Sequence, residues 1–169
     1  MSGIIGQVGA KSGIISGSSA TSAGTVTLSG ITGLDYEEGT FDIAVSGASA
    51  SATMHSGYKT LSYTKVGKMI TFLGHIVVTN ENGMGASVKV TGFPFVNGAH
   101  AGLRRTPVNI GGYTELSLDV AGYSLTGSIF ESASIMYIYE YGITSGTRAL
   151  AGADWGAGQA HLCGTYFID

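Results

Sequence analysis

The stretch Lys68–Thr79, which reads KMITFLGHIVVT, carries the strongest strand signal in the sequence. Its side chains alternate between two faces with the period of two that marks a β-strand. The two faces are Ile70, Phe72, Gly74, Ile76 and Val78, and Met69, Thr71, Leu73, His75 and Val77. Since both faces are largely apolar, we expect one to lie on the core of a sandwich and the other against a neighbouring subunit.

Similar strand patterns lie on both sides of this stretch. The predicted strands are Thr25–Ile31, Thr40–Val45, Leu61–Thr64, Ser87–Thr91, Glu115–Val120, Ser124–Phe130, Ser134–Tyr141 and Gln159–Ile168. Gly, Asn and Ser turns separate them, and no window carries an apolar stripe at helical spacing that is free of glycine. The expected fold class is all-β, an antiparallel β-sandwich of jelly-roll type, with a barrel as the alternative.

The first 24 residues differ from the rest of the chain, because they consist almost wholly of Gly, Ser, Ala and Ile. The segment Ser2–Gly6 (SGIIG) is echoed by Ser12–Ser16 (SGIIS). Glycine loses the most backbone entropy on ordering, so such a segment is expected to order only on a partner. We predict an extended N-terminal arm over residues 1–24 and a β-sandwich domain over 25–169; a disordered tail is the alternative for the arm. The anchoring residues would be Ile4, Ile5, Ile14 and Ile15.

Charged residues make up 11% of the chain, whereas an average soluble domain has about 25%. Either uncharged polar residues hydrate the surface, or much of it is buried against other subunits, and we favour burial in an oligomer. The net charge of −3 argues against a nucleic-acid partner, and the adjacent cations Arg104 and Arg105 are expected in a solvated loop. The most apolar run, Met69–Val78, is far shorter than the roughly 20 residues of a membrane helix.

The histidines His55, His75, His100 and His161 have no spacing typical of a metal site, and no Gly-x-Ser-x-Gly motif is present. Cys163 is alone and is expected to be a small buried hydrophobe. We therefore expect no enzyme activity, no metal and no cofactor.

Cleavage of a carbohydrate would need two carboxylates beside the scissile bond. The acids Asp35, Glu37 and Glu38 come close together, but they are expected in a solvated loop that lacks an aromatic platform. A polysaccharide depolymerase is for this reason the least favoured function.

Two further groups of residues are candidates for contact with a partner. Asp154 and Trp155 lie in a Gly- and Ala-rich segment, Ala149–Ala160, where an exposed indole beside a carboxylate could hold a sugar ring or a protein neighbour. Packing of Trp155 inside the protein is the favoured alternative. Tyr137, Tyr139 and Tyr141 share one face of a predicted strand, and we expect a subunit interface there rather than a sugar-facing stripe.

Several short motifs together resemble bacteriophage virion proteins. The N-terminal SGIIG repeat is similar to the N-terminal segment of many phage tail and virion proteins. The remaining motifs resemble the C-terminal jelly-roll modules of phage fibres: Gly57-Tyr58, Tyr63-Thr64-Lys65-Val66-Gly67, Val90-Thr91-Gly92-Phe93-Pro94-Phe95 and Gly164-Thr165-Tyr166-Phe167. Each motif is short, and their order and spacing carry the resemblance. The resemblance implies a trimeric virion protein with a β-sandwich body.

The expected function is that of a structural component of a phage particle: a small homotrimeric fibre or capsid-decoration subunit that binds other virion proteins through residues 1–24. The alternative is a receptor-binding tip that recognises host surface glycans. The sequence leaves head decoration, head fibre and tail fibre open.

Overall fold

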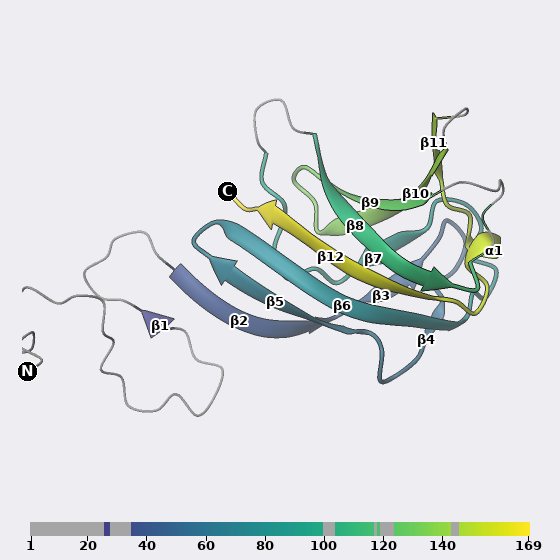
Figure 1. Cartoon of the computed structure of the whole chain (residues 1–169), viewed down its shortest axis with the longest axis horizontal. Coiled ribbons are helices and arrows are strands. Elements are labelled where there is room, and N and C mark those ends of the chain that lie inside the picture. Colours follow the sequence, from purple (N-terminus) through teal and green to yellow (C-terminus); the bar gives the residue numbers. More distant parts are fainter. Residues whose placement is uncertain (1–25, 28–34, 100–103, 117, 119–123, 143–145) are drawn as a thin grey trace, which may run out of the picture.

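The computed structural model describes residues 26–27, 35–99, 104–116, 118, 124–142 and 146–169 (Figure 1). The predicted arm, with Ile4, Ile5, Ile14 and Ile15, lies outside the described residues. Within them the chain is all-β apart from one short helix, α1 (Gly152–Trp155). The all-β prediction is confirmed.

The strands are all paired antiparallel within one sheet. They are β1 (Val26–Thr27), β2 (Asp35–Asp42), β3 (Ala44–Ser46), β4 (Thr53–Met54), β5 (Thr60–Val66), β6 (Met69–Asn80), β7 (Lys89–Thr91), β8 (Arg105–Thr114), β9 (Ser124–Phe130), β10 (Ile135–Gly142), β11 (Gly146–Ala149) and β12 (Gln159–Phe167). Their order across the sheet is β1-β2-β5-β6-β12-β8-β9-β10-β7-β3, with β11 beside β10 and β4 beside β6.

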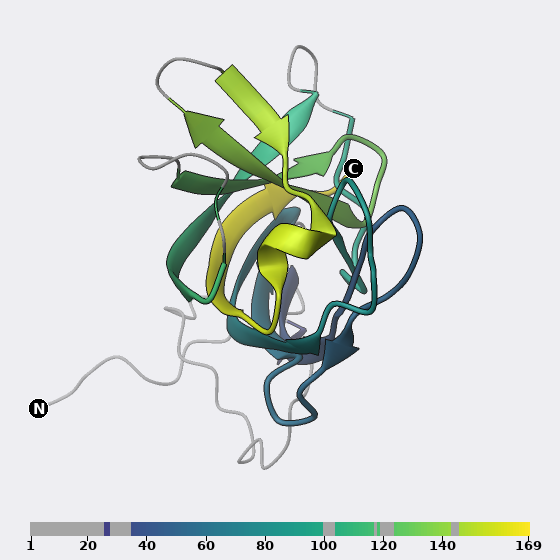
Figure 2. The same ribbon diagram turned by 90° about the vertical axis from the view of Figure 1, so that its right-hand side faces the viewer.

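The sheet curls until its two ends nearly meet (Figure 2). The chain runs from β2 through Ile43 into β3, yet β2 pairs with β5 near one end of the sheet and β3 pairs with β7 at the other. One stretch of backbone therefore links both ends, so the sheet is almost a closed barrel. This corresponds to the barrel alternative, and the all-β antiparallel part of the sandwich prediction holds.

The inner face of the sheet forms the core. On β6, Ile70, Phe72, Ile76 and Val78 are at most 1% exposed, as the alternation in the sequence predicts. Aromatic rings from distant segments meet there in edge-on and tilted contacts: Phe72 lies 5.1 Å from Phe93 and 6.1 Å from Tyr166 between ring centroids. This cluster ties β6, β12 and the segment after β7 together.

The acidic residues at the start of the domain lie on a strand, so the expectation of a solvated loop is wrong. Glu37 and Glu38 belong to β2 and point to opposite sides of it. The Tyr63 hydroxyl donates a hydrogen bond to Glu37, which raises the pKa of Tyr63 to about 12. The Tyr36 hydroxyl donates to Glu38 and raises the pKa of Tyr36. Tyrosine partners, which the sequence pattern did not indicate, explain why these acids suit a strand.

The segment from Arg105 to Val120 was also predicted incorrectly where it is described. Arg105 begins β8, a ten-residue strand that includes Pro107. At Pro107 the pairing is with β9, and the pairing with β12 begins at Val108, so the missing N–H of proline faces no ladder partner. The predicted strand Glu115–Val120 does not form at Glu115, because Glu115 takes a left-handed φ of 58° that breaks the pleat.

Candidate interaction surface

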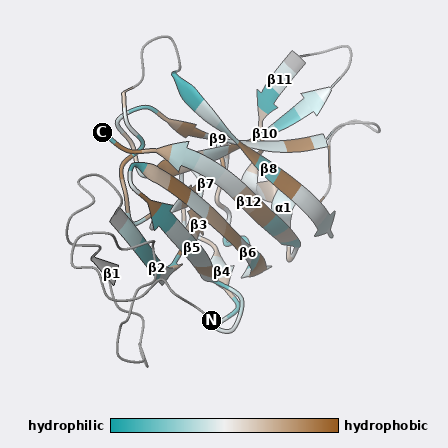
Figure 3. Cartoon of the chain, turned by 60° about the vertical axis from the view of Figure 1, so that its left-hand side comes forward, coloured by the Kyte–Doolittle hydropathy of each residue, from teal (hydrophilic) through white to brown (hydrophobic). Residues whose placement is uncertain are grey.

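The side of the sheet that points away from the core is here called the outer face. It consists of the outward side chains of β5, β6, β12, β8, β9 and β10. One row of cross-strand neighbours crosses it completely: Ser62, Leu73, Cys163, Asn109, Thr126 and Tyr139. The outer face is thus one continuous surface, although its strands come from distant parts of the sequence (Figure 3).

Large apolar side chains are exposed on β6 and β12. Leu73 is 62% exposed, and the cross-strand neighbours Met69 and Phe167 are 38% and 46% exposed. Between them, Thr71 and Thr165 join their hydroxyls at 3.0 Å. The outward half of β6 was predicted to be apolar and available to a subunit, and the structure places these residues at the surface of the protomer.

The outer face is nearly free of charge. The row through Leu73 contains no Asp, Glu, Lys or Arg, and the neighbouring row consists of Thr64, Thr71, Thr165, Pro107, Ser128 and Tyr137. The cation at its margin, Arg105, lies over the rings of Phe130 and Tyr139, with 4.4 and 5.6 Å to the ring centroids. A surface without charge costs little to desolvate, which is the property of an interface core.

An open groove of about 520 Å³ runs along the outer face over β6, β12, β8 and β9. Leu73, Asn109 and Cys163 are among its lining residues. Cys163 is exposed, so the expectation that it is buried is wrong. The strand alternation explains this, because Leu162 and not Cys163 takes the inward position on β12.

The three tyrosines singled out in the sequence lie on this same outer face. Met136 and Ile138 are fully buried on β10, whereas Tyr137 and Tyr139 are half-buried and Tyr141 is 57% exposed. Tyr137 and Tyr139 are the last members of the two rows that begin on β5. A subunit interface at the tyrosines stays a prediction, and the structure adds that they and Leu73 belong to one surface.

Trp155 lies at the end of α1 and is completely buried. Its indole N–H donates to the carbonyl of Gly158 at 3.2 Å. Of the two interpretations of Trp155, packing inside the protein agrees with this placement, whereas stacking on a sugar ring would need an exposed indole. The polar edge of the ring is satisfied within the chain, so the indole can remain in the core.

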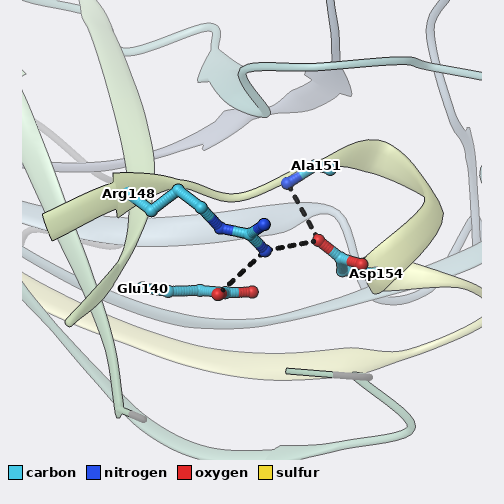
Figure 4. A network of polar contacts seen from close by, with 4 residues as sticks. All are labelled: Glu140, Arg148, Ala151 and Asp154. Atoms are coloured by element: carbon cyan, nitrogen blue, oxygen red, sulfur yellow. Dashed lines mark hydrogen bonds and ion pairs between the residues drawn. The ribbon is translucent and has the colours of Figure 1, made fainter. Parts of the chain in front are cut away.

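Asp154 takes part in an ion-pair network that the sequence did not reveal (Figure 4). Arg148 Nη2 lies 3.4 Å from Asp154 Oδ2 and 3.1 Å from Glu140 Oε2, and Ala151 N donates to Asp154 Oδ2 at 3.2 Å. Glu140 is fully buried. The sequence indicates this position, because Met136, Ile138 and Glu140 are alternate residues of β10 and therefore lie on the same, inner face.

Because the carboxylates of Glu140 and Asp154 both contact one nitrogen of the Arg148 guanidinium, this network connects β10, β11 and α1. Glu140 Oε1 has no hydrogen-bond partner within the described residues.

The described part of the chain holds no group of three or more His, Cys, Asp or Glu side chains arranged to bind a metal ion. Within the same residues, no helix has the length and apolar character needed to cross a membrane.

A row of four rings, here called the ring row, lies on the outer side where β6 meets the start of β12. It consists of His55, Tyr58, His75 and His161, with centroid distances of 4.9, 4.9 and 4.4 Å between successive rings. His75 and His161 are stacked at 16° and are direct cross-strand neighbours. No motif spacing predicts this row, because Tyr58 meets His75, and His75 meets His161, only through contacts between distant parts of the sequence.

Comparison with known proteins gives a likeness of fold. No family model matches the chain, and no curated protein matches it in sequence. The described fold is similar to the crystal structure of the Dettilon tailspike protein, with a TM-score of 0.64 at 15% sequence identity. The match covers 79% of this chain and 24% of the tailspike chain, so this chain spans about a quarter of that protein's length. At this identity the likeness establishes a shared fold.

Proposed function

We propose that this protein is a non-enzymatic structural subunit of a bacteriophage particle, and that it assembles as a homotrimer through the outer face of its sheet. The observation that carries the proposal is the uncharged outer face with Leu73 exposed near its centre. The fold likeness to a phage tailspike and the resemblance of the sequence motifs to phage fibre modules both support the phage assignment. Attachment to the particle through residues 1–24 belongs to the same proposal.

The composition of the outer face favours a second copy of this chain as the partner. Copies of this chain that meet over the two uncharged rows do not repel each other there, and Arg105, the cation at the margin, can stay at the edge of the contact. Burying Leu73, Met69 and Phe167 would remove apolar area from water, at roughly 25 cal/mol for each Å². A charged partner such as a nucleic acid would find no complementary group in these rows.

The outer face supplies part of the area that a stable contact needs. Six strands at about 4.8 Å spacing and eight residue steps of about 3.4 Å along β6 give an area of roughly 650 Å² measured along the curved sheet. A standard interface buries about 800 Å² of accessible surface on each partner, and side chains add to this area. Because the sheet curls into an almost closed barrel, a single neighbour meets only part of this curved area, and the surrounding loops must contribute the rest of each interface (Figure 2).

Light scattering coupled to size-exclusion chromatography tests this proposal. We expect the wild type at three times the 17.2 kDa mass of the chain, and Leu73→Asp at the mass of one protomer with an unchanged circular-dichroism spectrum. Ala48→Asp is the matched control, because it places the same charge at an exposed position outside the outer face. A wild type that stays at the protomer mass at every concentration, or a trimeric Leu73→Asp, would contradict the proposal.

A further inference from the structure

The edge of the sheet at β2 is open over most of its length. β2 pairs with β5 on one side, whereas on the other side β1 reaches no further than Tyr36. Within the described residues, no strand pairs with this second side beyond that point. At its far end β2 is covered again, because a Cβ on Gly92 would lie 2.3 Å from the carbonyl oxygen of Asp42. The open length therefore runs from Glu37 to Phe41.

The backbone groups of Glu38 and Thr40 point to this open side. Ile43 N donates to the carbonyl of Lys59 at 2.9 Å, so Ile43 and the alternate residues before it turn their N–H and C=O groups toward β5. Glu38 and Thr40 are residues in between, as is Tyr36, which pairs with β1. An unpaired edge of this kind is a template for a further strand. β2 thus offers two donors and two acceptors to a partner strand.

The pairing of β1 shows which part of the chain leads to this edge. Val26 lies opposite Tyr36, and β1 runs antiparallel to β2. Each residue before Val26 is therefore one step further along β2 in the same register, and 25 residues precede Val26 in the sequence. The pairs that this register sets opposite each other at the open edge are Gly24 with Glu38 and Ser22 with Thr40.

The segment 21–25, which reads TSAGT, suits this position chemically. It contains no charged residue and no proline, so each of its residues can donate to a ladder and none repels the carboxylate of Glu38. Gly24 leaves space beside that carboxylate, which already accepts a hydrogen bond from a tyrosine hydroxyl. Ser22 beside the exposed Thr40 would form the kind of hydroxyl pair that stabilises antiparallel strands.

A second copy of β2 fits the open edge less well. β2 reads DYEEGTFD, with four acids and no cation. Pairing of two such strands would bring carboxylates together, and like charges on neighbouring strands are destabilising. The segment 21–25 brings no charge to the edge, so it is the favoured occupant.

We propose that residues 21–25 continue β1 as a strand along the open edge of β2 in the same chain. The sheet of the protomer then begins at Thr21, and the residues before it are the part of the arm that is available for attachment to a particle. The added strand also removes an unpaired edge through which sheets of different copies could associate. This edge lies outside the outer face, so the inference depends neither on trimer formation nor on attachment.

Exchange of single amide hydrogens, measured by NMR on the full chain, tests the inference. In the wild type the amides of Glu38 and Thr40 should exchange at least tenfold more slowly than in Ser22→Pro. The proline removes one N–H of the proposed ladder and fixes φ at about −65°, away from the value of an extended strand. Ser18→Pro is the matched control, because position 18 lies past the open edge in the proposed register, and both amides should exchange there as in the wild type. The hydrogen-bonded amide of Ile43 should stay slow in all three proteins.

Faster exchange of Glu38 and Thr40 in Ser22→Pro alone, with Ile43 unchanged, supports the inference. It is overturned if the two wild-type amides exchange as fast as those of an unfolded chain, if Ser22→Pro exchanges like the wild type, or if Ser18→Pro accelerates exchange equally.

The wild type is also measured over a series of dilutions. Protection of Glu38 and Thr40 that is the same at every concentration supports pairing within one chain. Protection that is lost on dilution assigns the edge to a segment of a neighbouring copy and overturns the placement. The mass of the wild type in solution decides only whether the trimer forms, so the two proposals fail separately.

Discussion

The inner and outer faces of the sheet are made from alternate residues of the same strands, but they differ sharply in how far their apolar side chains are exposed. On β6, Phe72 is 1% exposed and its neighbour Leu73 is 62% exposed. The inner face is filled by rings and aliphatic side chains from most strands, whereas several apolar side chains of the outer face are exposed to solvent. Folding of the protomer therefore depends on the inner face, and association through the outer face is what we propose.

The largest expected change in stability comes from removing an aromatic ring from the inner face. Phe72→Ala removes a ring that contacts Phe41, Phe93 and Tyr166, and should lower the free energy of unfolding by about 3 to 5 kcal/mol. Ser62→Ala, at an exposed position on the outer face, should change it by less than about 0.5 kcal/mol. Urea unfolding followed by circular dichroism measures both. Equal losses in the two variants would contradict the division between the faces.

The second effect arises at high pH, because burial raises the pKa of the Tyr166 hydroxyl to about 12. The neutral hydroxyl donates to the carbonyl of Phe95 at 3.2 Å. Since the folded pKa lies above the unfolded value near 10, this stabilisation is complete below pH 10 and is lost as the pH rises through 12. The loss amounts to about 3 kcal/mol.

Urea unfolding of wild type and Tyr166→Phe between pH 8 and pH 12.5 measures this effect. The phenylalanine variant should lose less stability over that range, because it has no hydroxyl to ionise at this position. Parallel curves for the two proteins would show that Tyr166 does not carry the alkaline transition.

The smallest expected changes in stability come from substitutions of two glycines, one on each face. A Cβ on Gly74, on the inner face, would overlap Leu61, which is fully buried, so Gly74→Ala should destabilise the fold by about 2 kcal/mol. Gly111→Ala on the outer face meets nothing and should stabilise it by about 0.5 kcal/mol, through the unfolded chain. Thermal unfolding distinguishes the two. The comparison fails if Gly111→Ala costs as much as Gly74→Ala.

Much of the fold could be predicted from the period of two alone. The strands β6, β9, β10 and β12 lie within one or two residues of their predicted ranges, since apolar residues alternate strongly there. β8 was missed and β2 was predicted only from Thr40 onward, because their signals are local exceptions: acids that contact tyrosines in β2, and a proline in β8 at a residue that pairs with β9 alone. The curling of the sheet follows from long-range pairing, which alternation does not encode.

The candidate surface could be predicted only in part. Alternation placed the tyrosines of β10 and Leu73 of β6 on outward faces, but it did not show that both faces are one surface. That link depends on the register Leu73–Cys163–Asn109–Thr126–Tyr139, which no local pattern contains. The ring row depends on the same kind of register. The alternation of β10 places Glu140 on the inner face, but a charged residue is not expected there, so the sequence analysis did not single it out.

The most direct test of the docking role of the outer face uses Cys163, the one cysteine of the chain, which lies in the groove beside Leu73. The rate at which a bulky maleimide alkylates this thiol is measured in wild type and in Leu73→Asp at the same concentration. If copies of the chain cover the outer face, the wild type reacts at least tenfold more slowly than Leu73→Asp. Equal, rapid alkylation of both proteins would show that the outer face is uncovered and would contradict the account.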